Sequence, residues 1–169
     1  MKVFAVYGYS KSGKTTTIEC LIKELLRRHY TVGTVKEIHF ESFAIDTAGS
    51  NTDRHRKAGA ELVTARGLNE TDILFKERLP MQEILKFYTQ DFVILEGVTD
   101  FDAPKILCAS DLDDVAKRIN PSVFAISGVI SNDTDCYENL PVINALKDIE
   151  KLADLVEKTV KDWSLHDEY

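Results

Sequence analysis

Short apolar runs alternate with amphipathic helical patterns along most of the chain. Consecutive apolar residues are typical of strands that are buried on both faces of a parallel sheet. The predicted strands cover residues 3–7, 31–36, 72–75, 91–97, 104–109 and 123–126. The order of strands and helices therefore predicts an α/β fold, with a mainly parallel sheet between two layers of helices.

Helical periodicity predicts the elements between these strands. After residue 15, Ile18, Leu21 and Leu25 recur at helical spacing, with charged residues on the opposite face. Four further helices are expected at 53–66, from Pro80 through Tyr88, from a capped start at 110–113, and from Pro141 to Trp163. The last one carries a long apolar stripe, which we interpret as core. The final five residues are expected to fray.

Composition limits the kind of protein this is. The 169 residues are 44% hydrophobic and 29% charged, which fits a single domain over residues 1–169. A net charge of -7 without a long basic run argues against nucleic acid as the main partner. No apolar stretch approaches the ~20 residues that span a membrane. The first predicted strand leaves no room for a signal peptide, and Cys20, Cys108 and Cys136 form no motif, so we expect a cytoplasmic protein.

The segment Gly8–Thr15, with the sequence GYSKSGKT, carries the strongest chemical signal. It matches the phosphate-loop pattern G-x-x-x-x-G-K-[ST] between a predicted strand and a predicted helix. The glycines let backbone N–H groups approach a polyphosphate, and the helix N-terminus favours its negative charge. Lys14 is expected to reach the β- and γ-phosphates, and the Thr15 hydroxyl to hold Mg²⁺. The sequence therefore predicts binding of a nucleoside triphosphate.

Glu96 ends the predicted strand 91–97. Open α/β sheets bind their ligands at the carboxyl ends of their strands, so this carboxylate is a candidate ligand for Mg²⁺. The alternative is a carboxylate that only caps a neighbouring turn. The aperiodic stretch 37–52 is interpreted as a functional loop. The basic run 54–57 is either a solvated helix face or a patch for an anionic ligand.

Three stretches together resemble the molybdopterin-guanine dinucleotide biosynthesis protein B family, MobB. The first is the end of the phosphate loop, Gly13–Thr16, and the second is Asp46–Thr52 followed by Arg56–Ala60. The third is Leu95–Gly97 with Pro104–Ile106 a few residues later. The resemblance extends from residue 1 to about residue 130.

The resemblance implies a weak GTPase with Mg²⁺ that forms homodimers. It implies a role beside the molybdopterin guanylyltransferase, which joins GMP to molybdopterin, and molybdopterin itself is a further candidate ligand. It places Asp46 near the γ-phosphate, so Lys14 and Asp46 are the candidate catalytic residues. Thr15 and Glu96 become the candidate metal ligands. The residues expected to bind the nucleotide phosphates are Gly8, Ser10, Lys11, Ser12, Gly13, Lys14, Thr15 and Thr16.

The chain also departs from the family pattern. Asn51 stands where the family has Asp, and Ser50 where it often has Lys, which weakens the case for a catalytic carboxylate in this loop. No Asn-Lys-x-Asp motif follows the strand 123–126, so the sequence does not choose between guanine and adenine. No arginine or glutamine is obviously placed to orient water, so slow or partner-dependent hydrolysis is expected.

Two other functions remain open from the residues alone. A small kinase acting on a nucleoside or metabolite could use the basic run 54–57 to hold an acceptor phosphate. A GTPase that delivers metal to an enzyme would need clustered His and Cys, whereas the four histidines of this chain are scattered.

Overall fold

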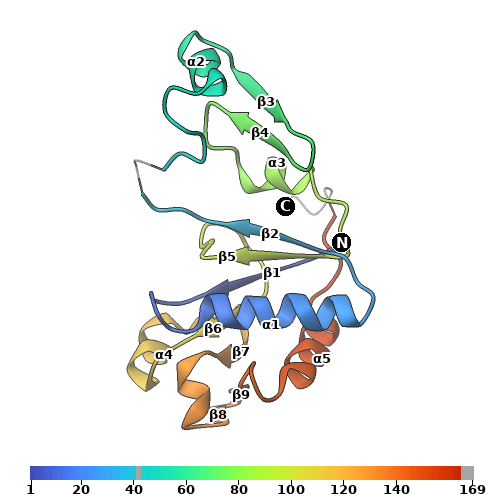
Figure 1. The fold of residues 1–169 in the computed structure, drawn as a ribbon. Helices are drawn as coiled ribbons and strands as arrows, with labels where there is room; N and C mark the ends of the chain where they lie inside the picture. The colour runs from blue at the N-terminus through green and yellow to red at the C-terminus, as the bar shows by residue number, and fades with distance from the viewer. Residues whose placement is uncertain (41–42, 165–169) are drawn as a thin grey trace. The chain divides into compact units, whose positions relative to one another are not determined.

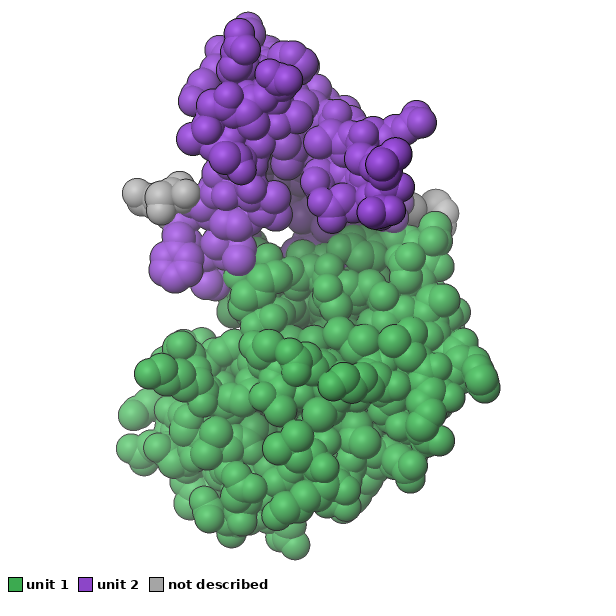
Figure 2. All heavy atoms as spheres, viewed as in Figure 1, with its two compact units in different colours: residues 1–37, 88–169 green, residues 38–87 purple. Residues whose placement is uncertain are grey.

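The computed structural model describes residues 1–40 and 43–164. The chain forms two compact units, shown in different colours in Figure 2. The larger unit contains Met1–Glu37 and the chain from Tyr88 onward, and the smaller unit contains Ile38–Phe87. That residues 1–169 act as a single domain stays a prediction.

The larger unit is built on a sheet of five parallel strands (Figure 1). Their order is β2-β5-β1-β6-β7. The strands are β1 (Lys2–Tyr7), β2 (Val32–Lys36), β5 (Phe92–Glu96), β6 (Lys105–Cys108) and β7 (Val123–Ser127). All five coincide with runs that the sequence analysis assigned to strands. Because they are parallel, the loop after β1 and Glu96 at the end of β5 lie at the same edge of the sheet.

Helices cover both faces of this sheet. On one face α1 (Lys14–Arg27) and α5 (Ile149–Thr159) pack on a core that includes Ile106 and Cys108. On the other face α4 (Leu112–Arg118) packs through Val115 on a cluster that includes Leu107. Successive residues of β6 contact opposite helix layers because side chains alternate along a strand. The helices on both faces confirm the predicted α/β/α arrangement.

A short 3-10 helix and a small hairpin follow β7. They are η1 (Val129–Asn132), β8 (Cys136–Tyr137) and β9 (Leu140–Pro141). The long helix expected from Pro141 is wrong in its first part, because α5 begins only at Ile149. Ile143 instead extends the sheet by donating its N–H to Ile126 O at 2.8 Å, and Leu146 is exposed. The tail expected to fray, 165–169, lies outside the described residues.

An ionic network joins α1 to α5. Glu24 is 5% exposed and accepts hydrogen bonds from Arg27 Nε and Arg28 Nε, both at 2.7 Å. These hydrogen bonds lower the pKa of Glu24 to about 2. Arg28 also pairs with Asp154 at 2.6 Å and Glu157 at 2.8 Å. The network therefore stabilises the packing of the two helices on the core.

The smaller unit contains two short helices and a two-stranded ribbon. They are α2 (Asn51–Lys57), β3 (Leu62–Arg66), β4 (Thr71–Phe75) and α3 (Met81–Leu85). The predicted helix 53–66 is wrong, because α2 ends at Lys57 and β3 pairs with β4 in antiparallel register. Gly59, at φ 111°, adopts a conformation that stops a helix. In β3 only Val63 is buried, and its neighbours are exposed, which is the period of a strand.

Candidate nucleotide-binding site

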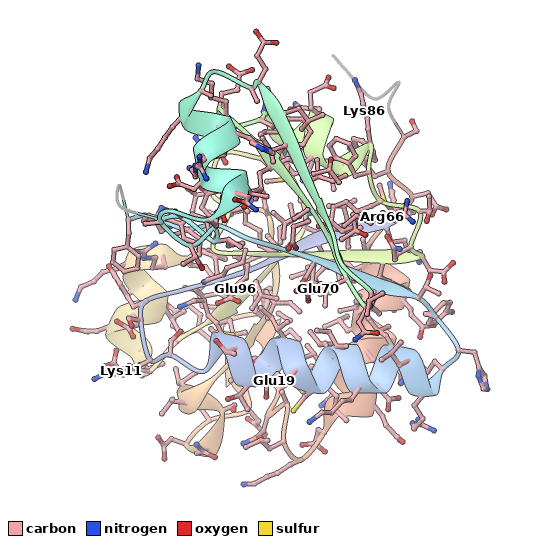
Figure 3. All side chains as sticks on the ribbon, turned by 45° about the horizontal axis from the view of Figure 1, so that its top comes forward. Lys11, Glu19, Arg66, Glu70, Lys86 and Glu96 are labelled. Atoms are coloured by element: carbon pink, nitrogen blue, oxygen red, sulfur yellow. The ribbon has the colours of Figure 1, made fainter. Side chains whose placement is uncertain are left out.

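The phosphate loop connects β1 to α1 through a backbone that only glycine allows at its start. Gly8 has φ 146°, and a Cβ atom added there would lie 1.9 Å from Cys108 O. Lys11 and Gly13 also have positive φ, at 64° and 95°. Figure 3 labels Lys11 on this loop, just ahead of α1. These conformations turn the chain tightly enough for N–H groups to face one concave side.

A second loop, after β7, braces the phosphate loop. Val129 N donates to Ser12 O at 3.1 Å. A Cβ atom on Gly128 would lie 2.1 Å from the same carbonyl, and one on Gly13 would lie 3.0 Å from Gly128 Cα. The two backbones therefore touch, and the contact requires both glycines. From the sequence, this loop is only a candidate for reading the base, and its contact with the phosphate loop was not predicted.

Lys14 lies folded against its own loop. Its Nζ donates to Gly8 O at 3.1 Å and to Tyr9 O at 2.5 Å, and both partners are uncharged. Burial is the largest cause that lowers the pKa of Lys14. Lys36 and Arg118 lower this pKa further, while Cys108 and Glu96 oppose them. Several charges therefore act on Lys14 at once. Among the described residues, no carboxylate is recorded in direct contact with its ammonium group.

The first turn of α1 offers donors beside this lysine. Gly13 is the N-cap, and no side chain caps the helix. The first backbone N–H groups of a helix have no partner within it. Thr15 and Thr16 are exposed in this turn. The turn can therefore donate hydrogen bonds to an anion, and the helix dipole favours one there.

Glu96 already has a cationic partner that sequence reasoning missed. Strands β2 and β5 place Lys36 beside Glu96 in the ladder, and Lys36 Nζ lies 2.7 Å from Glu96 Oε1. The Glu96 side chain is 16% exposed, whereas that of Lys36 is 50% exposed. The pairing depends on β2 and β5 being neighbours, although 50 residues of a separate unit lie between them in the chain.

The oxygen atoms at this edge of the sheet are ligands of the kind that Mg²⁺ prefers. The Thr15 hydroxyl and the Glu96 carboxylate are hard oxygen ligands, and Mg²⁺ is commonly held by one or two such groups together with water and phosphate oxygens. Glu96 (labelled in Figure 3) would have to exchange the Lys36 ammonium for the metal or its water. Within residues 1–40 and 43–164, no three His, Cys, Asp or Glu side chains gather into a metal site.

Asp46 lies in the smaller unit and has local partners. Its Oδ1 accepts hydrogen bonds from Ser50 Oγ and Thr52 Oγ1, both at 2.8 Å. Its Oδ2 is buried and has no hydrogen-bond partner within the described chain. Ser50 also caps α2 by accepting from Asp53 N. This polar cluster orders the start of α2, and the role of Asp46 at the γ-phosphate stays a prediction.

The basic run 54–57 occupies the last turns of α2. Lys57 pairs with Asp53 at 2.7 Å, so one positive charge of the basic run is neutralised within α2.

No helix in the described ranges combines the length and apolarity needed to cross a bilayer.

Comparison with known proteins identifies the family. The family model described as "Molybdopterin guanine dinucleotide synthesis protein B" matches residues 3–129. The chain belongs to the MobB family. This result agrees with the resemblance noted from the phosphate loop, the segment around Asp46 and the segment that contains Glu96.

Curated relatives carry names of the same kind. A Methanocaldococcus jannaschii protein named "Putative molybdopterin-guanine dinucleotide biosynthesis adapter protein" is 32% identical over 120 residues, which are 67% of this chain and 49% of the relative. A Bacillus subtilis protein named "Probable molybdopterin-guanine dinucleotide biosynthesis adapter protein" is 24% identical, with 85% of each chain covered. The match thus spans about half the length of the archaeal relative.

Solved MobB structures share the fold. A crystal structure of Bacillus subtilis MobB has a TM-score of 0.75 at 22% identity, covering 96% of this chain and all of that one. A MobB homologue from Bacillus stearothermophilus has a TM-score of 0.69 at 23% identity, covering 94% and 97%. These likenesses support the mainly parallel α/β fold.

Proposed function

We propose that this protein binds GTP with Mg²⁺ and acts as an adapter in molybdenum or tungsten cofactor biosynthesis. Its partner would be the enzyme that attaches GMP to molybdopterin, and molybdopterin itself is a further proposed ligand. The observation that carries the proposal is the phosphate loop, braced by Gly128, in a chain that belongs to the MobB family. The free cysteines Cys20, Cys108 and Cys136 fit a cytoplasmic location.

The proposal gives each group at the site one task. The backbone of the loop Gly8–Thr16 holds the β- and γ-phosphates, and Lys14 leaves the carbonyls of Gly8 and Tyr9 to contact them. Thr15 and Glu96 hold Mg²⁺, directly or through water. Asp46 is proposed to approach the γ-phosphate. Hydrolysis would be slow without a partner, so the bound triphosphate serves as a state or as a substrate for that partner.

Calorimetric titration tests nucleotide binding directly. The wild-type protein should bind GTP more tightly with Mg²⁺ than without it, and more tightly than ATP. Lys14→Ala should remove most of the binding and leave the fold intact, because this side chain contributes charge and little packing. Tight binding of ATP without binding of GTP would refute the proposal. A phosphorylated product from a nucleoside or metabolite acceptor would favour the kinase alternative.

We also propose that the protein is a homodimer, and that the smaller unit contributes to the interface. This unit has only 50 residues, but it exposes many large apolar side chains. They are Phe40, Phe43, Ile45, Leu62, Leu68, Ile73 and Phe87. A two-stranded ribbon is only marginally stable alone, so a second copy of the chain that covered these apolar side chains would stabilise it. Sedimentation equilibrium should give twice the chain mass, and a monomer at all concentrations would refute this.

A further inference from the structure

One arginine beside the phosphate loop is not explained by the proposed roles above. The guanidinium carbon of Arg118 lies 4.0 Å from the centroid of the Tyr9 ring. Tyr9 is the second residue of the phosphate loop and is 39% exposed. Arg118 itself is the last residue of α4, which packs on the face of the sheet opposite α1.

Two tyrosines, one on each side of Gly8, fix the position of Arg118. Tyr7 is buried at the end of β1, and its hydroxyl donates to Arg118 O at 2.5 Å. Asn120 Nδ2 donates to the same tyrosine hydroxyl at 2.9 Å. Tyr7 thus holds the backbone of Arg118, while Tyr9 holds its side chain.

The stacking leaves the hydrogen-bonding edge of Arg118 available. A guanidinium that lies over an aromatic ring keeps its N–H donors in the plane of the group, pointing away from the ring. Among the described residues, the structure records no hydrogen bond and no carboxylate partner for this guanidinium. Arg27 and Arg28, at the end of α1, differ in this respect, because each of them pairs with a carboxylate.

Electrostatics place this charge within range of the phosphate site. The positive charge of Arg118 contributes to lowering the pKa of Lys14, after the larger effect of burial. Burial raises the pKa of Tyr7, and the charge of Arg118 opposes this rise. Arg118 therefore acts on the same small region as Lys14, from the side of the loop that carries Tyr9.

We propose that Arg118 is a second phosphate-binding cation of this site, held ready on Tyr9 and contacting the terminal phosphates of the bound nucleotide. Guanidinium groups bind phosphate oxygens through two parallel N–H bonds, which a lysine cannot provide. The inference rests on the proposed binding of GTP. It supplies in the same chain an arginine that the sequence pattern alone did not place near the phosphates.

Titrations with GTP, GDP and inorganic tripolyphosphate test the role of Arg118. Tripolyphosphate has no base, so its binding isolates the contacts to phosphate. Arg118→Gln should weaken GTP and tripolyphosphate binding about tenfold to a hundredfold, the range expected for a charged hydrogen bond. GDP, which lacks the terminal phosphate, should be affected less. Arg118→Lys should restore only part of the affinity.

Lys117→Gln is the matched control. It removes the same charge one position earlier on α4, from an exposed side chain that lies 3.7 Å from Asp113. This variant should bind all three ligands within about twofold of wild type, since exposed ion pairs contribute little. Tyr9→Leu removes the ring over which Arg118 lies and should reproduce part of the Arg118→Gln defect. Circular dichroism melting curves check that each variant folds.

Two results would overturn the inference. Arg118→Gln could bind GTP as well as wild type, or Lys117→Gln could lose as much affinity as Arg118→Gln, which would indicate only a general field effect. Either result would leave the proposed function standing if Lys14→Ala still abolished binding. If wild type bound no triphosphate at all, the proposed function would fail first.

Discussion

Substituting Gly128 by alanine tests whether the contact between Gly128 and Ser12 O positions the phosphate loop. A second glycine variant measures the effect of backbone strain without this contact. The new Cβ would lie 2.1 Å from Ser12 O, so this carbonyl would have to retreat by about 0.9 Å to reach 3.0 Å, the lower limit of real Cβ contacts. Ser12 O also accepts from Val129 N at 3.1 Å, and a shift of that size away from β7 would break this hydrogen bond. The substitution therefore displaces the loop that should hold the phosphates.

The expected loss has two parts. A non-glycine residue at φ +91° costs about 1–3 kcal/mol, and a lost backbone hydrogen bond adds about 1 kcal/mol. Gly59→Ala is the control, since Gly59 has φ +111° and no atom within 4 Å of an added Cβ. It carries backbone strain of the same kind without the contact. The difference between the two variants in ligand affinity thus reports the contact with Ser12.

The assay is calorimetric titration with GTP and Mg²⁺, combined with urea unfolding followed by circular dichroism. Gly128→Ala should lose at least tenfold in GTP affinity, which corresponds to about 1.4 kcal/mol. Gly59→Ala should keep the affinity of wild type. Equal affinities in Gly128→Ala and Gly59→Ala would show that the brace does not position the loop, and would refute the reasoning.

Three further predictions concern charged groups. Glu96→Gln should weaken GTP binding with Mg²⁺ and change it little in EDTA, and an unchanged metal dependence in titrations would contradict the proposed ligand role. Lys36→Gln should lower the Mg²⁺ concentration at the midpoint of metal-dependent GTP binding. The reason is that the ammonium 2.7 Å from Glu96 no longer competes with the metal for this carboxylate. An unchanged or higher midpoint would argue against such competition. Glu24→Gln should lower the free energy of unfolding at pH 7 by about 2 kcal/mol, because two arginines lose a charged acceptor. The Glu24 pKa is depressed from 4.5 to about 2, so its contribution is complete above pH 4.5 and is lost as the pH falls toward 2. The difference between wild type and Glu24→Gln in urea unfolding should therefore shrink over that range, and a constant difference would contradict the assignment.

The strands and the phosphate loop were predictable because their signals are local. Continuous apolar runs such as Phe92–Leu95 need no partner to be recognised as buried strands. The capped start of α4 was also correct, since Asp111 accepts from Asp114 N at 2.8 Å. The same local signals give a wrong prediction at 53–66, where Gly59 lies between helix α2 and strand β3. They also give a wrong prediction at 141–148, where Ile143 pairs with β7 despite its helical spacing to Leu146.

The contacts that shape the site depend on strand order, which no local pattern contains. Lys36 reaches Glu96 only because β2 and β5 are neighbours. Gly128 reaches Ser12 only because β7 ends at the same edge as β1. Arg118 follows no motif, and its relation to Tyr9 comes from the length and direction of α4. A sequence can thus predict the loop that binds phosphate, but not the residues that other strands and helices bring to it.

The smaller unit is an enlarged crossover between two adjacent strands. Parallel neighbours always require a connection that returns the chain to the opposite edge, and here that connection is Ile38–Phe87. Its first attachment point is Glu37, whose N–H donates to Glu96 O at 2.9 Å. Its return point is Tyr88, whose hydroxyl donates to Thr34 O of β2 at 2.7 Å. Both ends of the inserted unit are therefore tied to backbone groups of adjacent strands, and one tie is made to Glu96, the residue proposed to hold Mg²⁺.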